Sequence, residues 1–291
     1  MNVKNEICKS FNDHAALYEQ SAKIQHEIGS RLLEKLDYLK IEPRYILDLG
    51  CGPGVFTKKL KKLYPKATII GFDLAIDMLK EAREKQGLFK KWPLVGGDML
   101  TLPFASGVFD LIFSNQVIHW SESIKDLLDE LSRVMSKDGC LLFSTLGPDT
   151  FTELRQAWAT IDNYAHVNDY IDMLDLGDFL LSLKFIDPVI EMEIIKAHFS
   201  SLEKLLHSLK SQGVRNINLA RNPGLTGKRS WINFKHAINA FSLENGDIPL
   251  TYEVIYGLAW KGATRTVDKG VETIIPVNDL LKTYNLSKLS K

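Results

Sequence analysis

A loop rich in glycine follows an apolar run near residue 45, and it is the first feature of the chain that could bind a ligand. Gly50, Gly52 and Gly54 alternate with other residues in the stretch DLGCGPG. Glycine takes positive φ values at no steric cost and lets a ligand lie against the backbone. The spacing differs from G-x-G-x-x-G, with which dinucleotide sites hold a pyrophosphate. The loop therefore predicts a nucleotide-like ligand and disfavours a NAD-type cofactor; a glycine-rich turn without a ligand is the other alternative.

Three aspartates accompany this loop. Asp48 comes two residues before the first glycine, where a carboxylate pointing into the same crevice would repel phosphate and suit a cationic ligand. Asp73 ends the run IIGFD and is placed to accept hydrogen bonds from both hydroxyls of a ribose. Asp98, in GGDML, ends the next run, where it could meet an adenine amino group. The remaining candidates are the small Cys51 within the loop, expected to pack rather than react, and the apolar walls Leu74, Met78 and Met99.

Alternating strands and helices must position these groups between residues 45 and 147. Short runs such as YILDLG, ATIIGFD and FDLIFSN are apolar on both faces, as strands of a parallel sheet covered by helices must be. The pattern predicts a doubly wound α/β sheet, whose ligands bind at the carboxyl ends of the strands. A helix is expected over residues 11–39, where apolar residues recur at helical spacing.

After Pro148 the regular alternation stops. Helices are expected over 149–185, 201–214 and 231–242, and strands over 189–199 and 252–263. Helices inserted between late strands would lie over the carboxyl edge of the sheet and could form a lid. The expected organisation is an N-terminal helical segment (1–40), a ligand-binding core (41–147), a substrate-binding lid (148–250), a final core strand (251–262) and a polar, partly disordered tail (263–291).

Composition excludes several classes of function. Lys plus Arg number 36, and so do Asp plus Glu, so the chain lacks the basic excess typical of nucleic-acid binders. It has no run of about 18 apolar residues, which argues against a membrane protein. Cys8, Cys51 and Cys140 are an odd number without paired metal-ligand spacing. They predict reduced thiols, no metal site and a cytoplasmic protein.

These motifs together resemble the class I S-adenosylmethionine-dependent methyltransferases. DLGCGPG, GFD, GDM and the block LPFASGVFDLIFSNQVIHW occur in that family's order and spacing, over about residues 40–147. The resemblance implies a seven-stranded Rossmann-like sheet with S-adenosylmethionine as cofactor. It also implies that Asn115 and Gln116, after the fourth strand, shape the cofactor side of the crevice.

The outer segments add a second, more specific resemblance. FNDHAALYEQSAKIQ, LGPDTFTELRQAW, HVNDYIDMLDLGDFLL, GVRNINLARNPGLTGK and YEVIYGLAW are together similar to the malonyl-[acyl-carrier protein] O-methyltransferases of biotin synthesis. This match runs nearly from one end of the chain to the other. It implies methyl esterification of the free carboxyl of a malonyl thioester, which hides the charge so that fatty-acid enzymes accept the unit as a primer.

Such a reaction requires few catalytic groups. A carboxylic acid titrates at about pH 4, so the acceptor is already an anion and needs no general base. The site must align its oxygen with the methyl carbon and exclude water. Arg155 is the first candidate to clamp the carboxylate in a bidentate fork, with a solvated helix arginine as the alternative. The Tyr18 hydroxyl could reach the cofactor's carboxylate or the acceptor, and His119 could pack or contact substrate. Phe151, Trp158 and Tyr164 could line a channel for a pantetheine arm, or pack in the core.

The lid segment has an uneven distribution of charge. Residues 201–236 contain seven basic side chains against one acidic, and residues 148–179 contain seven acidic against one basic. Acyl carrier proteins are acidic, so a basic patch would steer one toward the lid and weaken with salt. The patch would consist of Lys204, Lys210, Arg215, Arg221, Lys228 and Arg229. The alternative is that the two stretches neutralise each other.

Two other functions are compatible with the loop. One is a methyltransferase of the same fold acting on a quinone or another small acid. The other is an S-adenosylmethionine-binding assembly factor that modifies or chaperones a protein partner. The loop argues for cofactor binding in each case, and only an assay of methyl transfer separates them.

Overall fold

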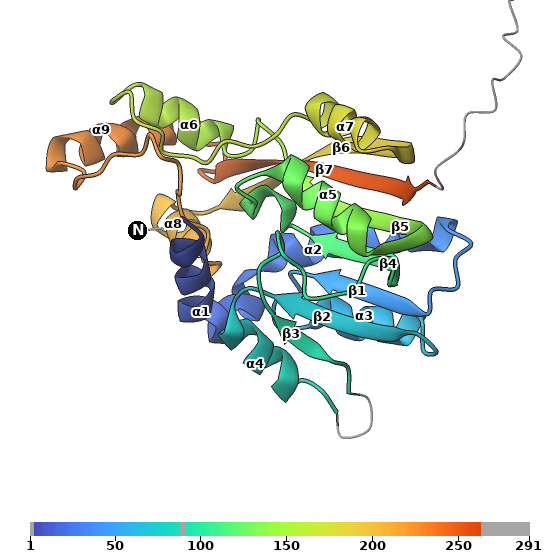
Figure 1. The fold of residues 1–291 in the computed structure, drawn as a ribbon. Coiled ribbons are helices and arrows are strands. Elements are labelled where there is room, and N and C mark those ends of the chain that lie inside the picture. Colours follow the sequence, from blue (N-terminus) through green and yellow to red (C-terminus); the bar gives the residue numbers. More distant parts are fainter. Residues whose placement is uncertain (1–2, 88–90, 263–291) are drawn as a thin grey trace, which may run out of the picture.

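A seven-stranded sheet forms the centre of the molecule in the computed structural model, which describes residues 3–87 and 91–262 (Figure 1). The strands are β1 (Tyr45–Leu49), β2 (Thr68–Asp73), β3 (Leu94–Gly96), β4 (Phe109–Asn115), β5 (Met135–Leu146), β6 (Phe185–Phe199) and β7 (Ile248–Lys261). Their order is β3-β2-β1-β4-β5-β7-β6, and β7 is antiparallel to both its neighbours while all other pairs are parallel. The predicted doubly wound sheet is confirmed.

Helices cover both faces of the sheet. They are α1 (Val3–Ser21), α2 (Lys23–Glu34), α3 (Val55–Leu63), α4 (Ile76–Glu84), α5 (Ile124–Val134), α6 (Thr152–Ala159), α7 (Met173–Ser182), α8 (Leu202–Ser211) and α9 (Lys228–Asn239), with short 3-10 turns η1 (Lys35–Tyr38) and η2 (Ile118–Trp120). One face packs against α2 and α3 through the fully buried Leu32 and Leu60. The other packs against α5 and α7 through Leu131 and Leu180. These two apolar clusters hold the strand ends, and therefore the ligand crevice, in place.

The crevice lies where the winding of the sheet reverses. β1 pairs with β2 on one side and with β4 on the other, so the connections from β1 and β4 leave in opposite directions. In sheets of this kind the carboxyl ends of the strands open a crevice at that point. The glycine loop follows β1, Asp73 ends β2, and Asn115 ends β4, so the fold gathers these predicted residues at one edge.

The N-terminal helix differs from the expectation of one helix over residues 11–39. It begins earlier, at Val3, and the chain breaks between α1 and α2 at Ala22, which is fully buried. Ala22 has φ −82° and ψ 40°, outside helical geometry. The sequence has no proline or glycine at this break. The packing of two helices in different directions produces the break, so no local sequence signal marks it.

The predicted helix over 149–185 is also wrong in its middle part. Only α6 and α7 are helical there, and residues 160–172 form an irregular loop that begins with a turn. Aspartate side chains account for this, because the Tyr164 amide donates to Asp162 (3.0 Å) and the Leu174 amide to Asp172 (2.7 Å). Such local hydrogen bonds compete with a helix.

Two buried carboxylates fix the start of the lid segment to β7. Glu253 accepts from the Asp149 amide at 2.6 Å, and Glu153 accepts from the Thr251 amide at 2.9 Å. The turn between β5 and α6 is thereby held against β7, and the Phe151 ring meets the Tyr252 ring edge-on at 5.0 Å. Figure 1 shows α6 and α9 together at the same end of the molecule, where Trp158 stacks on Phe234.

Candidate functional site

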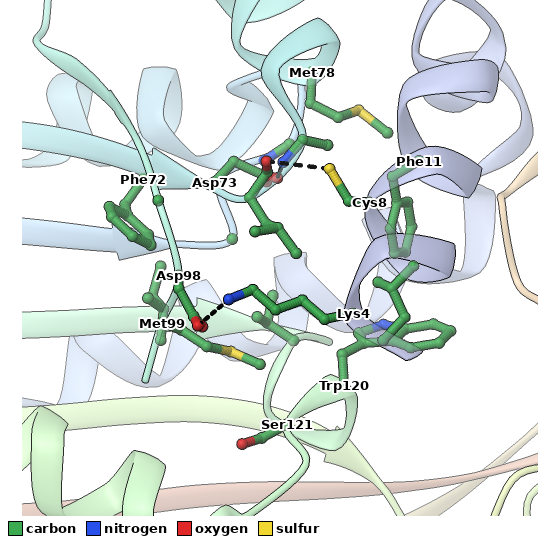
Figure 2. A pocket seen from close by; sticks show the side chains of 18 of the residues that line it. Lys4, Cys8, Phe11, Phe72, Asp73, Met78, Asp98, Met99, Trp120 and Ser121 are labelled. Atoms are coloured by element: carbon green, nitrogen blue, oxygen red, sulfur yellow. Dashed lines mark hydrogen bonds and ion pairs between the residues drawn. The ribbon is translucent and has the colours of Figure 1, made fainter. Parts of the chain in front are cut away.

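A pocket of about 230 Å³ opens at the carboxyl ends of β1, β2 and β4. Figure 2 shows strand-end residues on one side and α1 on the other, with Lys4, Cys8 and Phe11 pointing across from the helix. The predicted residues that line this pocket are Tyr18, Gly50, Gly52, Asp73, Leu74, Met78, Asp98, Met99, Asn115 and Gln116. Most of the predicted cofactor residues therefore converge here.

The glycines of the loop serve different purposes. Gly50 has φ +69°, and a Cβ there would lie 2.1 Å from Val117, so the position requires glycine. Gly52 has φ +50°, and its missing Cβ would meet nothing within 4 Å, which leaves room for a ligand against the backbone. Gly54 faces Ala82 and Trp92 instead and does not line the pocket. Two glycines thus belong to the site and the third packs α3 against α4.

Asp48 does not point into the crevice, contrary to the sequence prediction. Its side chain is buried beneath the loop, accepts a hydrogen bond from the Thr57 hydroxyl on α3, and does not line the pocket. Side chains alternate along β1, so Leu47 and Leu49 face the α5 side while Asp48 faces α3. Cys51 is likewise buried, with its sulfur beside Gly71, and does not line the pocket.

The stability of the ligand-free protein is expected to rise as the pH falls toward acid. Burial raises the pKa of Asp48 to about 7; the hydrogen bond from Thr57 lowers the pKa in part, and the charge of Asp73 raises it further. An aspartate in the unfolded chain titrates at about 3.9. The folded state therefore binds the proton more tightly between these values. The free energy of unfolding should increase by up to about 1.4 kcal/mol per pH unit as pH falls through that window. Urea unfolding at several pH values measures this slope.

Asp48→Asn is the matched variant for this prediction. It keeps the size of the side chain and removes the titrating group, so the pH slope should become shallower by the contribution of one proton. Asp73, whose pKa burial also raises, is left to titrate in both proteins. Equal slopes in the variant and the parent protein would contradict the prediction.

Asp73 and Asp98 are the two predicted carboxylates that reach the pocket, which Glu122 also lines. Asp73 accepts from the amides of Gly52 and Ala75, each at 2.8 Å, which ties the glycine loop to the end of β2. Asp98 accepts from the Leu100 amide at 3.1 Å and from Lys4 of α1. Burial alone raises the pKa of Asp98, but these hydrogen bonds outweigh it and hold the pKa below its usual value. Both side chains present carboxylate oxygens to a ligand, and Asp98 shares its own with Lys4.

Apart from the predicted Tyr18, the lining from α1 was missed in the sequence, although a signal for it exists. Lys4, Ile7, Cys8 and Phe11 all line the pocket, and their spacing extends the helical repeat upstream of residue 11. They close the side of the crevice opposite the strand ends, and the Phe11 ring meets the Trp120 ring edge-on at 5.4 Å.

Asn115 and Gln116 lie at the end of β4 as predicted. Asn115 donates to the Gln25 carbonyl at 3.1 Å and accepts from Ser144, so it joins β4 to α2 and β5. Gln116 has φ +60°, which is unusual for a residue other than glycine. Three hydrogen bonds hold it there, from its amide to the carbonyl (3.1 Å) and the hydroxyl (3.0 Å) of Ser144 and from its side chain to the Thr145 carbonyl at 3.3 Å. Strained backbone of this kind clusters at functional sites.

A small chamber of about 30 Å³ adjoins the first pocket, and we call it the inner chamber. Its lining residues are Phe11, Tyr18, Gln25, Gln116, His119, Trp120, Leu146, Phe151, Tyr170, Gln212, Val214 and Tyr252. It shares Phe11, Tyr18, Gln116 and Trp120 with the first pocket. A third space of about 560 Å³ under α6 and α8, the outer cavity, shares Phe151, Tyr170 and Val214 with the chamber. The three spaces follow one another from the crevice to the lid.

The residues predicted to act on an acceptor occupy three different places. Tyr18 lines both the first pocket and the inner chamber. His119 lines the chamber, lies 3.4 Å from the Thr145 hydroxyl, and has a pKa lowered to about 3 by burial. Arg155 lines none of the three spaces. Its side chain is 40% exposed and donates weakly to the carbonyls of Pro148 (3.3 Å) and Asn168 (3.4 Å).

Of the three aromatic residues for which a channel or core packing was predicted, two line the outer cavity. Phe151 and Trp158 line the outer cavity, and Trp158 is stacked between His166 (3.8 Å) and Phe234 (4.1 Å). Tyr164 is exposed and does not line it, because the predicted helix that would have carried it inward is replaced by a turn. Lys210 and Arg215 line the same cavity from the other side.

Two kinds of feature are missing from residues 3–87 and 91–262. No group of His, Cys, Asp or Glu side chains in this part of the chain is arranged to hold a metal ion. No helix in it is both long and apolar enough to cross a membrane. The predicted tail, residues 263–291, lies outside the described residues.

The first pocket fits S-adenosylmethionine. Asp73 and Asp98 present carboxylate oxygens to it, which suit a ligand with hydroxyl and amino donors, and Gly52 leaves the backbone open to close approach. Leu74, Met78 and Met99 supply apolar surface. Apolar walls with a few placed polar groups are typical of small-molecule sites.

Known proteins place the chain in one family. A family model described as "Methyltransferase domain" matches residues 47–143. A relative from Legionella pneumophila, named malonyl-[acyl-carrier protein] O-methyltransferase, is 57% identical over 282 residues, covering 97% of this chain and 99% of the relative. The solved YcgJ protein of Bacillus subtilis has a TM-score of 0.56 at 16% identity, covering 80% of this chain and 98% of its own.

A second solved structure shares the fold. It is a S-adenosylmethionine-dependent methyltransferase from Archaeoglobus fulgidus, with a TM-score of 0.50 at 18% identity, covering 84% of this chain and 98% of its own. At such low identity these two structures show the fold alone. The near full-length relative shows more, and the chain belongs to the malonyl-[acyl-carrier protein] O-methyltransferase family of the class I S-adenosylmethionine-dependent methyltransferases.

Proposed function

We propose that this protein transfers a methyl group from S-adenosylmethionine to the free carboxylate of a malonyl thioester, carried by an acyl carrier protein or by coenzyme A. The product is the methyl ester that primes biotin synthesis. The observation that carries this proposal is the extent of the match to the Legionella protein, 97% of the chain. That match includes the lid segment, whereas the general methyltransferase model ends at residue 143. Acceptor choice in this fold depends on segments outside the core, so the lid is the informative part.

The chemistry agrees with the polar groups of the site. S-adenosylmethionine supplies an electrophilic methyl group on a positively charged sulfur. The acceptor carboxylate is ionised at neutral pH, so no side chain has to remove a proton from it. His119, with a pKa of about 3, is neutral there and is not poised as a base. The work left for the protein is to align two reactants and to keep water out.

The acceptor-site roles follow from these positions. Tyr18, on the border between the first pocket and the inner chamber, is proposed to contact both reactants. His119 is proposed to shape the chamber wall through contacts of its ring with the rings of Trp120 and Tyr170, whose centroids lie 5.2 Å and 5.7 Å away. Arg155 is proposed to assist the acceptor from outside the chamber. Burial raises the pKa of Tyr170, a chamber residue, and the charge of Arg155 acts on Tyr170 in the opposite direction.

The basic residues of the lid segment are proposed to dock the carrier protein. Lys210 and Arg215 are exposed at the outer cavity, and the loop that follows carries Leu219 and Leu225, 91% and 99% exposed. Exposed apolar side chains rimmed by charge are typical of protein interaction sites. Lys204, Lys228 and Arg229 are also exposed, whereas Arg221 is paired with Glu6. We call Lys210, Arg215, Leu219 and Leu225 the docking surface.

The ion pairs support docking over mutual neutralisation. Within the described chain, no ion pair joins an acidic residue of 148–179 to a basic residue of 201–236. Arg221 pairs with Glu6 of α1, and Lys235 with Glu203 of α8. Although Arg215 also interacts with Asp13 of α1, the basic residues at the outer cavity are not neutralised by the acidic stretch, and an acidic carrier protein is complementary to them.

Mass spectrometry of the acceptor tests the proposed function. The purified protein, given S-adenosylmethionine and malonyl-carrier protein, should add the mass of one methyl group to the carrier-bound acyl group. Acetyl-carrier protein, which has no free carboxylate, is the matched control and should stay unmodified. Absence of transfer to both malonyl-carrier protein and malonyl-coenzyme A would refute the proposal and would favour a different acceptor or an assembly role.

A further inference from the structure

One buried hydroxyl in the inner chamber has no hydrogen-bond partner among residues 3–87 and 91–262. Tyr252 of β7 is 2% exposed and lines the chamber. Within the described residues, its hydroxyl oxygen makes no hydrogen bond. A buried polar group left unsatisfied costs about 1–3 kcal/mol, so such groups are rare unless something else binds them. Burial, with the neighbouring Tyr170, raises the pKa of Tyr252, so the phenol keeps its proton and is a hydrogen-bond donor.

A second chamber residue has the complementary deficiency. The side-chain amide of Gln25 donates to Gln212 at 2.8 Å, while its oxygen accepts no hydrogen bond within the described residues. Gln212 donates in turn to the Ser21 carbonyl and the Ser208 hydroxyl, which fixes the orientation of both amides. Two residues of the chamber lining thus each carry a buried polar atom without a partner, one a donor and one an acceptor, and such atoms are expected where a ligand binds.

The chamber carries no charge of its own. None of its described lining residues is Lys, Arg, Asp or Glu, and its one histidine is neutral. Cations are found further out, since Lys210 and Arg215 line the outer cavity. A volume of about 30 Å³ exceeds the roughly 10–15 Å³ that a cavity needs to hold one water molecule but stays small, so only the tip of an acceptor enters it.

We propose that the Tyr252 hydroxyl donates a hydrogen bond to the acceptor carboxylate and holds it in the uncharged inner chamber, facing the first pocket. This proposal rests on the proposed function, because it takes the acceptor to be a carboxylate. It assigns the binding of the reacting group to a neutral donor rather than to a guanidinium. Tyr252 is therefore a binding residue for the acceptor, and Arg155 acts outside the chamber.

The reaction explains why a neutral donor suits this position. A lone pair of the carboxylate oxygen forms the new O–CH₃ bond while the S–CH₃ bond breaks and its electron pair returns to sulfur. An anion and a cation become a neutral ester and a neutral thioether, and no proton moves. A cation beside the oxygen would stabilise the anion before the reaction and lose that interaction afterwards. A phenol orients the oxygen with less of this penalty, and the dry surroundings strengthen attraction between the reactants.

Tyr252→Phe tests the proposal. We expect kcat/KM for malonyl-pantetheine to fall about 10-fold, as for a lost hydrogen bond to a charged group. The affinity of malonyl-pantetheine for the complex of the variant with S-adenosylhomocysteine, measured by calorimetry, should fall similarly. The affinity of the variant for S-adenosylmethionine should stay unchanged. The free energy of unfolding of the ligand-free variant should be unchanged or higher, because the hydroxyl has no partner to lose. If the hydroxyl had a merely structural role, its removal would lower the free energy of unfolding.

Tyr256→Phe is the matched control. Tyr256 lies on the same face of β7, its hydroxyl donates to Glu193 at 3.4 Å, and it does not line the chamber. This control should keep the rate and the affinity of the parent protein. If Tyr252→Phe matches the parent in both quantities, while the parent methylates malonyl-pantetheine, the inference is overturned. If the parent protein itself transfers no methyl group to malonyl thioesters, the proposed function has failed instead, and this inference fails with it.

Discussion

Replacing Asp73 by alanine is expected to weaken S-adenosylmethionine binding about 100-fold, the loss of roughly two hydrogen bonds to a charged group. Two effects add. The variant loses the carboxylate proposed to bind the ribose hydroxyls, and it frees the amides of Gly52 and Ala75 that Asp73 now holds at 2.8 Å. The loop would then lose its tie to β2 just where the cofactor lies against Gly52. Isothermal titration calorimetry with S-adenosylmethionine measures the change.

Two further variants show which effect dominates. Asp73→Asn keeps one oxygen and the shape of the side chain, so its affinity should lie between those of the alanine variant and the parent. Asp77→Ala removes an acid on α4 that pairs with Lys80 and does not line the pocket, and its affinity should match the parent. An alanine variant at position 73 that binds within about 3-fold of the parent would contradict the assignment, since that is less than one hydrogen bond.

The pH dependence of binding provides a second measure of the same carboxylate. Burial raises the pKa of Asp73, against the hydrogen bonds from the backbone. Its protonation therefore begins at a higher pH than for an exposed aspartate, and a protonated carboxyl group has one acceptor oxygen fewer. Affinity should consequently decline as the pH falls, and this decline should be absent from Asp73→Asn.

The sheet and most of the cofactor pocket were predictable because their signals are local. An apolar run that ends in aspartate specifies both a strand and a group at its carboxyl end, as for Asp73. Asp48 shows how far that reasoning holds. It lies one residue before the end of β1 rather than at its end, so strand alternation turns its side chain toward α3 and Thr57. The period of two along β1 contains this information, and the motif by itself does not.

The inner chamber could not be predicted in the same way. Gln25, His119, Tyr170 and Tyr252 come from α2, η2, a turn of the lid segment and β7. Each stands in an ordinary helical, loop or strand pattern, and only tertiary packing brings them together. Arg155 shows a different limit of prediction from sequence. Its helix was predicted correctly, but the backbone carbonyls of Pro148 and Asn168 hold its side chain at the surface.

Reversing two charges on the docking surface is expected to have the second largest effect. With Lys210→Glu and Arg215→Glu combined, kcat/KM for malonyl-carrier protein should fall about 50-fold at low salt, within the range over which electrostatic steering changes association rates. Arg215 also donates to Ser10 at 3.1 Å, so its loss has a local effect besides the charge. Turnover of malonyl-pantetheine, which offers no acidic protein surface, separates the two effects and should change far less.

The matched control reverses two charges elsewhere. Lys58→Glu with Lys62→Glu alters the net charge by the same amount on α3, where both lysines are exposed and neither lines the outer cavity. Because exposed charges are screened over about 10 Å at 0.1 M salt, the gap between the lid variant and the parent should narrow as salt is added. Equal losses in both double variants would mean that net charge alone attracts the carrier. Equal losses with malonyl-pantetheine and malonyl-carrier protein would mean that these residues act on the acceptor and not on the protein that carries it.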